Sequence, residues 1–426
     1  MKKINYLKEG IRVTSLLIDD IMFLFEFRMK DTYFTRTGRS KMSFKTIILF
    51  MINFVKKSLQ IELDDFSKIA SNPNITKQAF SQARQKVSPK AFTHMLNQVN
   101  KWYYKDTPFE KYSEYRLLAI DGTVLEINNT EELRNEFGYI ENQNKKVARA
   151  RASALYDVKN DMIVSSQLTH YRCGEREIAE NLIDQMIDLG SYNDLILFDR
   201  GYPSKDFITF IESRKLKYLM RVSSGFLRVV VNAPKADQII EVKHIDKILR
   251  MRVIKFELES VITETLVTNL FDEDLSLTDF KELYFKRWGI EVKYNEIKNK
   301  LQVENFTGQT VIAIEQDFYA TMYLANMVAL AKKDANQVIK EDCKNKNLKF
   351  EYKVNTNVLI GKLKDTLITM IITKNPWKRS KILKSIQVEI ERNIIPIRPG
   401  RKFVRKDHRS TQMDNMMNKK ELYNAK

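Results

Sequence analysis

The strongest constraint on the fold is a change in hydrophobic periodicity near residue 110. Up to about residue 105, apolar side chains recur every three or four positions, as in residues 11–27 and 44–61, which predicts helices. From about residue 115, short apolar runs typical of strands take over and alternate with helical stretches. The order strand, hairpin, helix, strand, helix predicts a mixed α/β layer with helices packed on a sheet.

Apolar runs and turn residues mark the expected elements of this α/β block. We expect strands at 116–127, 148–158, 162–170 and 194–198, a hairpin turn at 159–161, and helices at 175–189 and after the capping residue Ser204. Residues 217 to about 270 are again strand-rich, and we interpret them as a β insertion that interrupts the block. One long helix is expected from about 276 to 301, followed by further helix through 316–333.

The charge of the chain favours a polyanionic partner. Its 426 residues contain 72 Lys and Arg against 54 Asp and Glu, a formal net charge of +18. The excess is concentrated at the end, where residues 374–426 contain 15 basic and 5 acidic side chains, and the tail after Asn393 is basic, Pro-containing and aperiodic. Such a tail is typical of an arm that becomes ordered on a partner. A lysine-rich proteome would also produce a basic chain, so charge alone is weak evidence for a nucleic-acid ligand.

Other residue types exclude several classes of protein. The longest apolar stretch, 46–55, is shorter than the ~20 residues of a spanning helix, which predicts a soluble cytoplasmic protein with no membrane partner. Two cysteines, Cys173 and Cys343, lie 170 positions apart, and the four histidines are isolated. A disulfide framework and a thiolate or histidine metal site are therefore not expected.

The N-terminal region contains a candidate helix-turn-helix. A short helix at 63–70 is followed by a turn at 71–75, and Thr76 is a good cap for a second helix that extends to about Lys86. That helix exposes side chains of the types that contact bases and phosphates: Lys77, Gln78, Ser81, Gln82 and Gln85. A solvated helix face in a small bundle explains the same pattern equally well.

Two aspartates stand out because of their position in the predicted strands. Asp121 lies within the strand 116–127 and is followed by a glycine, and Asp199 directly follows the strand 194–198. An acidic residue in a buried strand costs free energy unless it is compensated. A single such aspartate usually caps a turn, but two on neighbouring strands are harder to explain in that way.

A third carboxylate comes from the long predicted helix. At about 100° per residue, Tyr284, Arg287, Glu291 and Lys298 fall at about 0°, −60°, −20° and −40°, so they share one narrow stripe. An exposed face with i,i+4 ion pairs would explain Arg287 and Glu291 but not the other two residues. Asp121, Asp199 and Glu291 together offer the oxygen ligands that Mg²⁺ prefers, and Mg²⁺ at such a site supports phosphoryl transfer. Arg287 and Lys298 are suited to holding phosphates beside the metal.

These residues resemble the DDE transposases of the insertion-sequence-4 family. The resemblance rests on Asp121-Gly-Thr, Asp199-Arg-Gly-Tyr and the signature Tyr-(2)-Arg-(3)-Glu-(6)-Lys, which matches at all four positions. It extends over nearly the whole chain through segments on both sides of the signature: 76–84, 266–270, 304–308 and 396–401.

The resemblance implies an α/β fold with a ribonuclease-H-like catalytic core that a β-strand insertion interrupts. The implied layout has five parts: a helical DNA-binding domain (1–110), the first part of the core (111–216), the β insertion (217–272), the second part of the core with the signature helix (273–335), and a C-terminal helical region with a basic tail (336–426).

The resemblance also implies a function and roles for the site residues. Asp121, Asp199 and Glu291 are expected to be the catalytic, metal-binding triad for Mg²⁺, with Mn²⁺ able to substitute. Tyr284, Arg287 and Lys298, and in the helical domain Lys77 and Gln78, are expected to contact DNA.

The expected partners are the element's terminal inverted repeats, target DNA and a second copy of the chain in a synaptic homodimer, in a bacterial cytoplasm and associated with the nucleoid. The expected reaction is cut-and-paste strand cleavage and transfer. Two alternatives remain: a transposase-derived DNA-binding protein without catalysis, and a metal-dependent nuclease without strand transfer. Phe226 in the β insertion has no assigned role, and Trp377 among basic residues fits DNA contact or a capping aromatic equally well.

Overall fold

The computed structural model describes residues 4–398 except 36–41, 54–57, 72, 142, 144, 258–262, 345 and 347. Most of the basic tail expected to become ordered on a partner therefore lies outside the described residues. In the part of the chain that is described, no helix is both long enough and apolar enough to cross a membrane.

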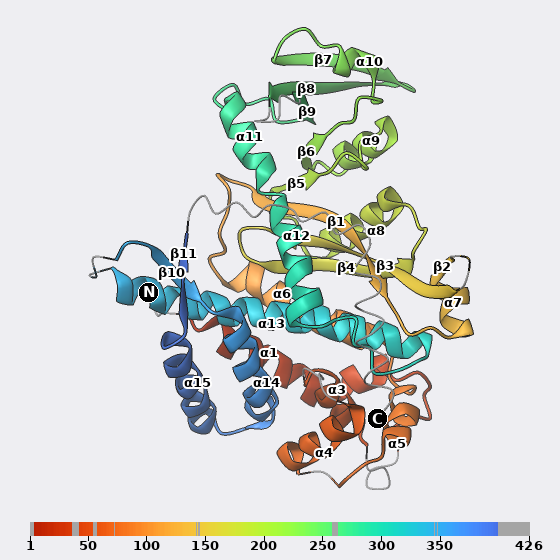
Figure 1. Cartoon of the computed structure of the whole chain (residues 1–426), viewed down its shortest axis with the longest axis vertical. Coiled ribbons are helices and arrows are strands. Elements are labelled where there is room, and N and C mark those ends of the chain that lie inside the picture. Colours follow the sequence, from red (N-terminus) through yellow and green to blue (C-terminus); the bar gives the residue numbers. More distant parts are fainter. Residues whose placement is uncertain are drawn as a thin grey trace.

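One large mixed sheet forms the centre of the molecule (Figure 1). Its strands, in spatial order, are β2 (Tyr139–Glu141), β3 (Lys146–Asp157), β1 (Arg116–Glu126), β5 (Asp194–Phe198), β6 (Lys217–Arg221), β9 (Thr263–Thr268), β8 (Lys247–Glu257) and β7 (Asp237–His244), with β4 (Met162–His170) also paired to β3. Strands β1, β3 and β4 are antiparallel, whereas β1, β5 and β6 are parallel. The strand-rich segment after residue 217 extends this sheet: β6 pairs with β5, and β9, β8 and β7 follow antiparallel.

Most of the predicted strands and helices in this block are confirmed. Strand β4, strand β5 and helix α8 (Glu175–Leu189) have the predicted bounds, because each is an apolar pattern bounded by turn residues. The hairpin turn between β3 and β4 is also present, and Asp161 adopts φ +59° there, a conformation that Asp tolerates better than most residues. Ser204 caps α9 (Lys205–Ser213) by accepting a hydrogen bond from the backbone N–H of Phe207.

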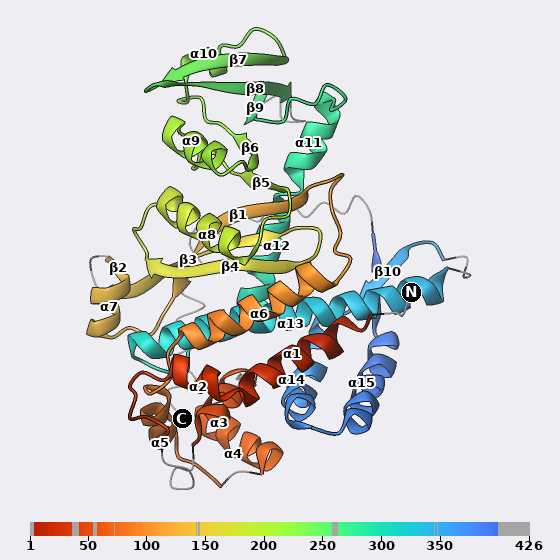
Figure 2. The ribbon, with the colours of Figure 1, turned by 180° about the vertical axis from the view of Figure 1, so that it is seen from behind.

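Helices cover both faces of the sheet. Helices α8 and α9 lie on one face, and α12 (Trp288–Asn295) lies on the other, as the two opposite views show (Figures 1 and 2). The long helix α13 (Val311–Cys343) runs below the sheet in both views and contacts β4. Two further short helices, α7 (Glu131–Phe137) and α10 (Arg228–Val231), accompany β2 and β7.

The N-terminal region is helical, as predicted, but some of its helices are divided. They are α1 (Tyr6–Asp19), α2 (Ile21–Phe27), α3 (Phe44–Met51), α4 (Leu59–Ala70), α5 (Lys77–Arg84) and α6 (Lys90–Asp106). The helix predicted across 11–27 is interrupted at Asp20, whose side chain caps α2 by accepting from the N–H of Met22. Thr76 caps α5, as predicted.

The single long helix predicted from 276 to 301 is wrong, because the chain divides it into three segments. They are α11 (Leu277–Phe285), α12, and a π-helical turn η1 (Glu296–Lys300). Between α11 and α12, the backbone N–H groups of residues 286, 287, 289 and 290 bond to carbonyls three positions back, which tightens the chain. At η1, the N–H of Leu301 bonds to the carbonyl of Glu296, five positions back.

The C-terminal region adds two helices and a small second sheet. Helix α14 (Thr356–Ile372) and helix α15 (Pro376–Glu391) pack beside α13. The aperiodic tail predicted after Asn393 is wrong over its first residues. Residues Ile394–Ile397 form β11, antiparallel to β10 (Glu351–Val354), because β-branched isoleucines favour a strand.

Candidate active site

Strand register brings the two aspartates together. Residues 116–119 of β1 pair in parallel with 194–197 of β5, always 78 positions apart, and the same offset places Asp121 beside Asp199. Strand β5 ends at Phe198, whereas β1 continues because it is still paired with β3. The two carboxylates therefore lie where neighbouring parallel strands separate. Each accepts a hydrogen bond of 2.8 Å from the backbone N–H of the next residue.

Helix α12 adds a third carboxylate and a cation at this point. Arg287, immediately before α12, donates from Nη2 to Oε1 of Glu291 at 3.0 Å. Its Nη1 lies 3.8 Å from Oδ2 of Asp121, and its Nη2 lies 3.9 Å from Oδ2 of Asp199. One guanidinium therefore lies among all three predicted acidic residues.

The site is a partly open acidic cluster around a buried cation. The side chain of Arg287 is 3% exposed, whereas those of Asp121, Asp199 and Glu291 are 25%, 35% and 38% exposed. Within the described structure, Nε and Nη1 of Arg287 are buried and have no hydrogen-bond partner. Buried donors without a partner cost free energy, so this arrangement favours an additional acceptor at the site.

Tyr284 and Lys298 also contact the sheet strands or the residues at their ends, so the predicted stripe is the face of this segment that packs towards the sheet. The Tyr284 hydroxyl donates to Oδ1 of Asp199 at 3.3 Å, and burial raises the pKa of this phenol well above its usual value. Lys298 donates to the carbonyl of Val124 at 2.8 Å, and burial lowers the pKa of its ammonium. Three of the four stripe residues gather at the paired aspartates, and Lys298 lies further along β1.

The site has an electrostatic asymmetry centred on Asp121. The pKa of Asp121 is raised to about 6, mainly by burial and also by the negative charges of Glu291 and Asp199. The hydrogen bond from Gly122 and the charge of Arg287 act in the opposite direction. For Arg287 itself, burial lowers the pKa, but Tyr284 and the carboxylates outweigh burial and the net shift is upward. The cluster is therefore short of positive charge.

Sequence analysis missed two residues that complete this site. The Tyr294 hydroxyl donates to the carbonyl of Asp121 at 2.8 Å and so fixes the strand that carries it. Arg221, the last residue of β6, lies 4.0 Å from Asp199 and donates to Glu264, with 2.5 Å between the paired atoms. Parallel pairing of β5 with β6 places Arg221 beside Asp199, but the strand order needed to infer this is not visible in the sequence.

Lys77 and Gln78 do not approach these carboxylates. Both are exposed on α5, which lies among the N-terminal helices on the other side of α13 from α12 (Figures 1 and 2). Gln85, expected to be exposed, instead donates to the hydroxyl of Thr310 at 2.9 Å. Trp377 is 83% exposed in the first turn of α15, and Phe226 is half-buried against the hydrophobic core.

The three carboxylates suit a hard divalent cation, although the guanidinium of Arg287 lies between them. Three carboxylates from two strands and a helix match the oxygen ligands that Mg²⁺ prefers. As positioned in the described part of the chain, no three His, Cys, Asp or Glu side chains are close enough together to hold a metal ion. The three carboxylates therefore have the chemistry to bind a divalent metal ion. In this arrangement the guanidinium of Arg287 supplies the positive charge among them.

Comparison with known proteins shows which family the chain is similar to. The family model for the transposase DDE domain matches residues 112–327, about half of the chain. The transposase InsG for insertion sequence element IS4, from Escherichia coli strain K12, is 23% identical over 286 residues, which are 61% of this chain. The aligned part spans 61% of that relative's own length.

A solved structure was also matched, the cryo-EM structure of the piggyBac transposase synaptic complex with hairpin DNA. The identity is 12% and the TM-score 0.43, with 96% of this chain and 79% of that chain covered. Residues 112–327, which the family model matches, contain Asp121, Asp199 and Glu291, the acidic residues of the motifs on which the sequence resemblance rests. The chain belongs to the DDE transposase family and is of the insertion-sequence-4 type.

Proposed function

We propose that this protein is a DNA transposase in which Asp121, Asp199 and Glu291 form the active site for strand cleavage and strand transfer. The observation that carries the proposal is the meeting of the three carboxylates around Arg287 at the point where β1 and β5 separate. Two of the three come from strands that are neighbours in the sheet but 78 positions apart in the sequence, and the third from a helix 92 residues after the second, so chance proximity is a poor explanation.

We also propose that the core of the sheet is ribonuclease-H-like. The order β4-β3-β1-β5-β6, with three antiparallel strands followed by two parallel ones, supports this assignment. The proposed layout keeps the parts 1–110, 111–216, 217–272, 273–335 and 336–426. Because β6 pairs with β5, the insertion proper would begin after Arg221.

Asp121, Asp199 and Glu291 would hold the metal, Mg²⁺ or in its place Mn²⁺. When bound there, a divalent ion polarises a phosphoryl oxygen and lowers the pKa of an attacking water or 3′-hydroxyl. The raised pKa of Asp121 fits this role, because a second cation at the cluster would favour its charged form.

Arg287 and Tyr284 would orient the scissile phosphate. The unpaired Nε and Nη1 of Arg287 are the donors that a phosphate oxygen requires, and guanidinium geometry suits such an acceptor. Tyr284, kept neutral by its raised pKa, retains its proton for hydrogen bonding. Lys298 contributes positive charge further along β1.

The N-terminal helices would bind the terminal inverted repeats of the element, in a synaptic homodimer that also engages target DNA. Helices α4 and α5 are joined by a short turn, and α5 exposes Lys77, Gln78, Ser81 and Gln82. These side chains can reach phosphates and base edges.

A plasmid cleavage assay tests the proposal. Wild-type protein, Asp199→Asn and the control Asp206→Asn, which removes an exposed carboxylate on α9, are incubated with a supercoiled plasmid that carries the gene's flanking DNA, with and without Mg²⁺. We expect wild type and Asp206→Asn to cut at discrete element ends with Mg²⁺ and join them to target, and Asp199→Asn to do neither.

The other outcomes identify the alternatives. Retardation of the ends in a gel without any cutting would indicate a DNA-binding protein without catalysis. Nicked ends that are never joined would indicate a nuclease without strand transfer.

A further inference from the structure

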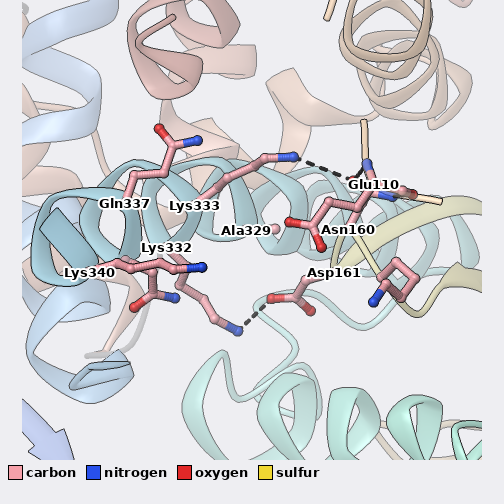
Figure 3. A pocket seen from close by; sticks show the side chains of 10 residues that line it. Glu110, Asn160, Asp161, Ala329, Lys332, Lys333, Gln337 and Lys340 are labelled. Carbon is pink, nitrogen blue, oxygen red and sulfur yellow. Dashed lines mark hydrogen bonds and ion pairs between the residues drawn. The ribbon is translucent and has the colours of Figure 1, made fainter. Parts of the chain in front are cut away.

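A second charged site lies on the opposite side of α12 from the carboxylates. It is a cavity of about 400 Å³ between α13, the hairpin that joins β3 to β4, and the segment before β1. Four lysines line it together with the amides of Asn160, Asn336 and Gln337 (Figure 3): Lys159, Lys332, Lys333 and Lys340. Nothing in the proposed catalytic chemistry uses these residues.

A second cavity continues this basic surface towards the end of α13. It has a volume of about 610 Å³ and shares Asn336 and Lys340 with the first. Its wall includes four more lysines, three from the segment between α13 and β10 and one from β10: Lys344, Lys346, Lys349 and Lys353. We call the two cavities together the α13 lysine surface. Eight lysines line it against three carboxylates, those of Glu110, Asp161 and Glu351.

Two of the lysines form the rigid inner wall. Lys332 bonds to Asp161 at 2.5 Å and to Glu296 at 3.1 Å, and Asp161 also binds Lys293 of α12 at 3.0 Å. Lys333 donates to the hydroxyl of Tyr103, with 2.5 Å between the two atoms. Through these contacts the carboxylate of Asp161 is paired with Lys332 and Lys293, and the wall of the cavity is bonded to α12.

The other lysines are exposed and make no ion pair with any carboxylate in the described part of the chain. They are Lys159, Lys340, Lys344, Lys346, Lys349 and Lys353. Lysines gathered at such spacing repel one another, so the arrangement is unfavourable unless a polyanion neutralises it. Six exposed lysines carry more positive charge than a single small anion would neutralise.

The spacing along α13 suits a linear array of phosphates. Lys333, Gln337, Lys340 and Lys344 follow one another at three- and four-residue steps, so they share one face of the helix. At a rise of 1.5 Å per residue, the eleven steps from residue 333 to residue 344 cover about 16 Å. One strand of B-DNA places a phosphate every 3.4 Å of axis, so the face spans roughly five phosphates.

We propose that the α13 lysine surface binds the sugar–phosphate backbone of duplex DNA beyond the segment that reacts. This inference rests on the proposed transposase function. Lys293 is two residues after Glu291 and points to the opposite side of α12, so the surface and the carboxylates flank one helix about 10 Å thick. Contacts to phosphate and sugar carry no base-sequence information, so a surface that binds the backbone positions DNA without adding sequence specificity.

Salt dependence of binding tests the proposal with a matched pair of double variants. Lys340→Gln/Lys344→Gln removes two exposed lysines one turn apart at the end of α13. Lys101→Gln/Lys105→Gln removes two exposed lysines one turn apart on α6, on the side away from Tyr103, the residue that binds Lys333 of the cavity wall. Both variants lose the same net charge and keep the helix.

Affinity of the full-length protein for a random-sequence duplex is measured over a range of salt concentrations. Each phosphate contact contributes about 0.9 to the slope of log Kobs against log salt. We expect the slope for Lys340→Gln/Lys344→Gln to be less steep than that of wild type by about 1.8, and the slope for Lys101→Gln/Lys105→Gln to be unchanged.

The possible failures are distinguishable. Equal slopes for wild type and both variants would overturn this inference while leaving the proposed function intact. Unchanged DNA slopes together with weaker binding of Lys340→Gln/Lys344→Gln to anionic phospholipid vesicles would assign the surface to lipid instead. Absence of DNA binding by wild type even at low salt would overturn the proposed function itself.

Discussion

A single buried guanidinium determines the charge state of the candidate active site. Arg287 lies within 4 Å of all three carboxylates, and its Nε and Nη1 are buried without a hydrogen-bond partner in the described structure. Asp121 is the carboxylate most affected by its surroundings, because burial raises its pKa to about 6. Changes at neighbouring residues should therefore be visible in the titration of Asp121.

Two substitutions should move the pKa of Asp121 in opposite directions. Arg287→Gln removes the charge that lowers it, so the pKa should rise above about 6, whereas Glu291→Gln removes a charge that raises it, so the pKa should fall. The measurement is an NMR titration of the Asp121 carboxyl carbon in metal-free protein. Shifts of the same sign in both variants would show that Asp121 does not interact with this pair as described.

The ion pair of Asp161 with Lys293 of α12 should make the stability of the folded protein depend on pH in the acid range. Although burial opposes ionisation, Lys293 and Lys332 hold the pKa of Asp161 below its usual value. A lowered pKa in the folded state stabilises the protein above the unfolded value of about 4, and this stability is lost as the pH falls below it.

We therefore expect Asp161→Asn to lower the free energy of unfolding at pH 7 by about 3 kcal/mol, because two buried lysines lose a partner. The loss should shrink as the pH falls from about 4. Urea unfolding of wild type and variant at several pH values checks this, and a loss that is constant down to pH 2 would contradict it.

At the scale of elements, local patterns predicted the strands and the stripe but not the break in the signature helix. Strand β5 and helix α8 have their predicted bounds because apolar runs and turn residues are local signals. Immediately after the break, α12 approaches the sheet closely: a Cβ on Gly289 would lie 3.1 Å from Cγ1 of Val158, in the β3–β4 hairpin. Periodicity along one segment contains no information about that approach.

Gly289→Val should therefore push α12 away from the sheet. We expect it to lower the free energy of unfolding by about 1–3 kcal/mol, the usual cost of overpacking. Gly361→Ala in α14 is the control, because a Cβ there meets no atom within 4 Å and the change should stabilise the helix by roughly 0.5–1 kcal/mol. Thermal unfolding of both variants measures the difference, and equal stability of Gly289→Val and wild type would refute the close packing.

At the scale of the whole molecule, the helices at both ends of the chain share one scaffold with α13. Both carboxylate oxygens of Asp334 in α13 accept backbone N–H bonds from Tyr6 and Leu7 at the start of α1, at 2.8 Å each. Arg84 at the end of α5 is 1% exposed and bonds to Gln316 and Asp317 of α13. The sequence showed a helical N-terminal region, but contacts between residues more than 200 positions apart were beyond local patterns.

Arg84→Met should destabilise the whole protein. Among the described residues, removing the guanidinium leaves the Asp317 carboxylate with Thr307 as its partner and breaks bonds to Gln316 and to the carbonyl of Ala313 on α13. We therefore expect a loss of about 3–5 kcal/mol. Chemical unfolding monitored by far-UV circular dichroism measures it. Arg12→Met, which breaks an exposed pair with Glu9, is the control and should cost less than about 1 kcal/mol.

The central claim is that Asp199 binds the divalent ion that cleaves DNA. Replacing it with cysteine exchanges a hard oxygen ligand for a sulfur, which Mg²⁺ accepts poorly and Mn²⁺ accepts better. The measurement is cleavage of an element-end duplex by wild type, Asp199→Cys and Asp199→Ala in each metal. We predict that wild type cleaves with both ions, Asp199→Cys with Mn²⁺ only, and Asp199→Ala with neither. Cleavage by Asp199→Ala, or equal cleavage by Asp199→Cys with Mg²⁺ and Mn²⁺, would contradict the claim.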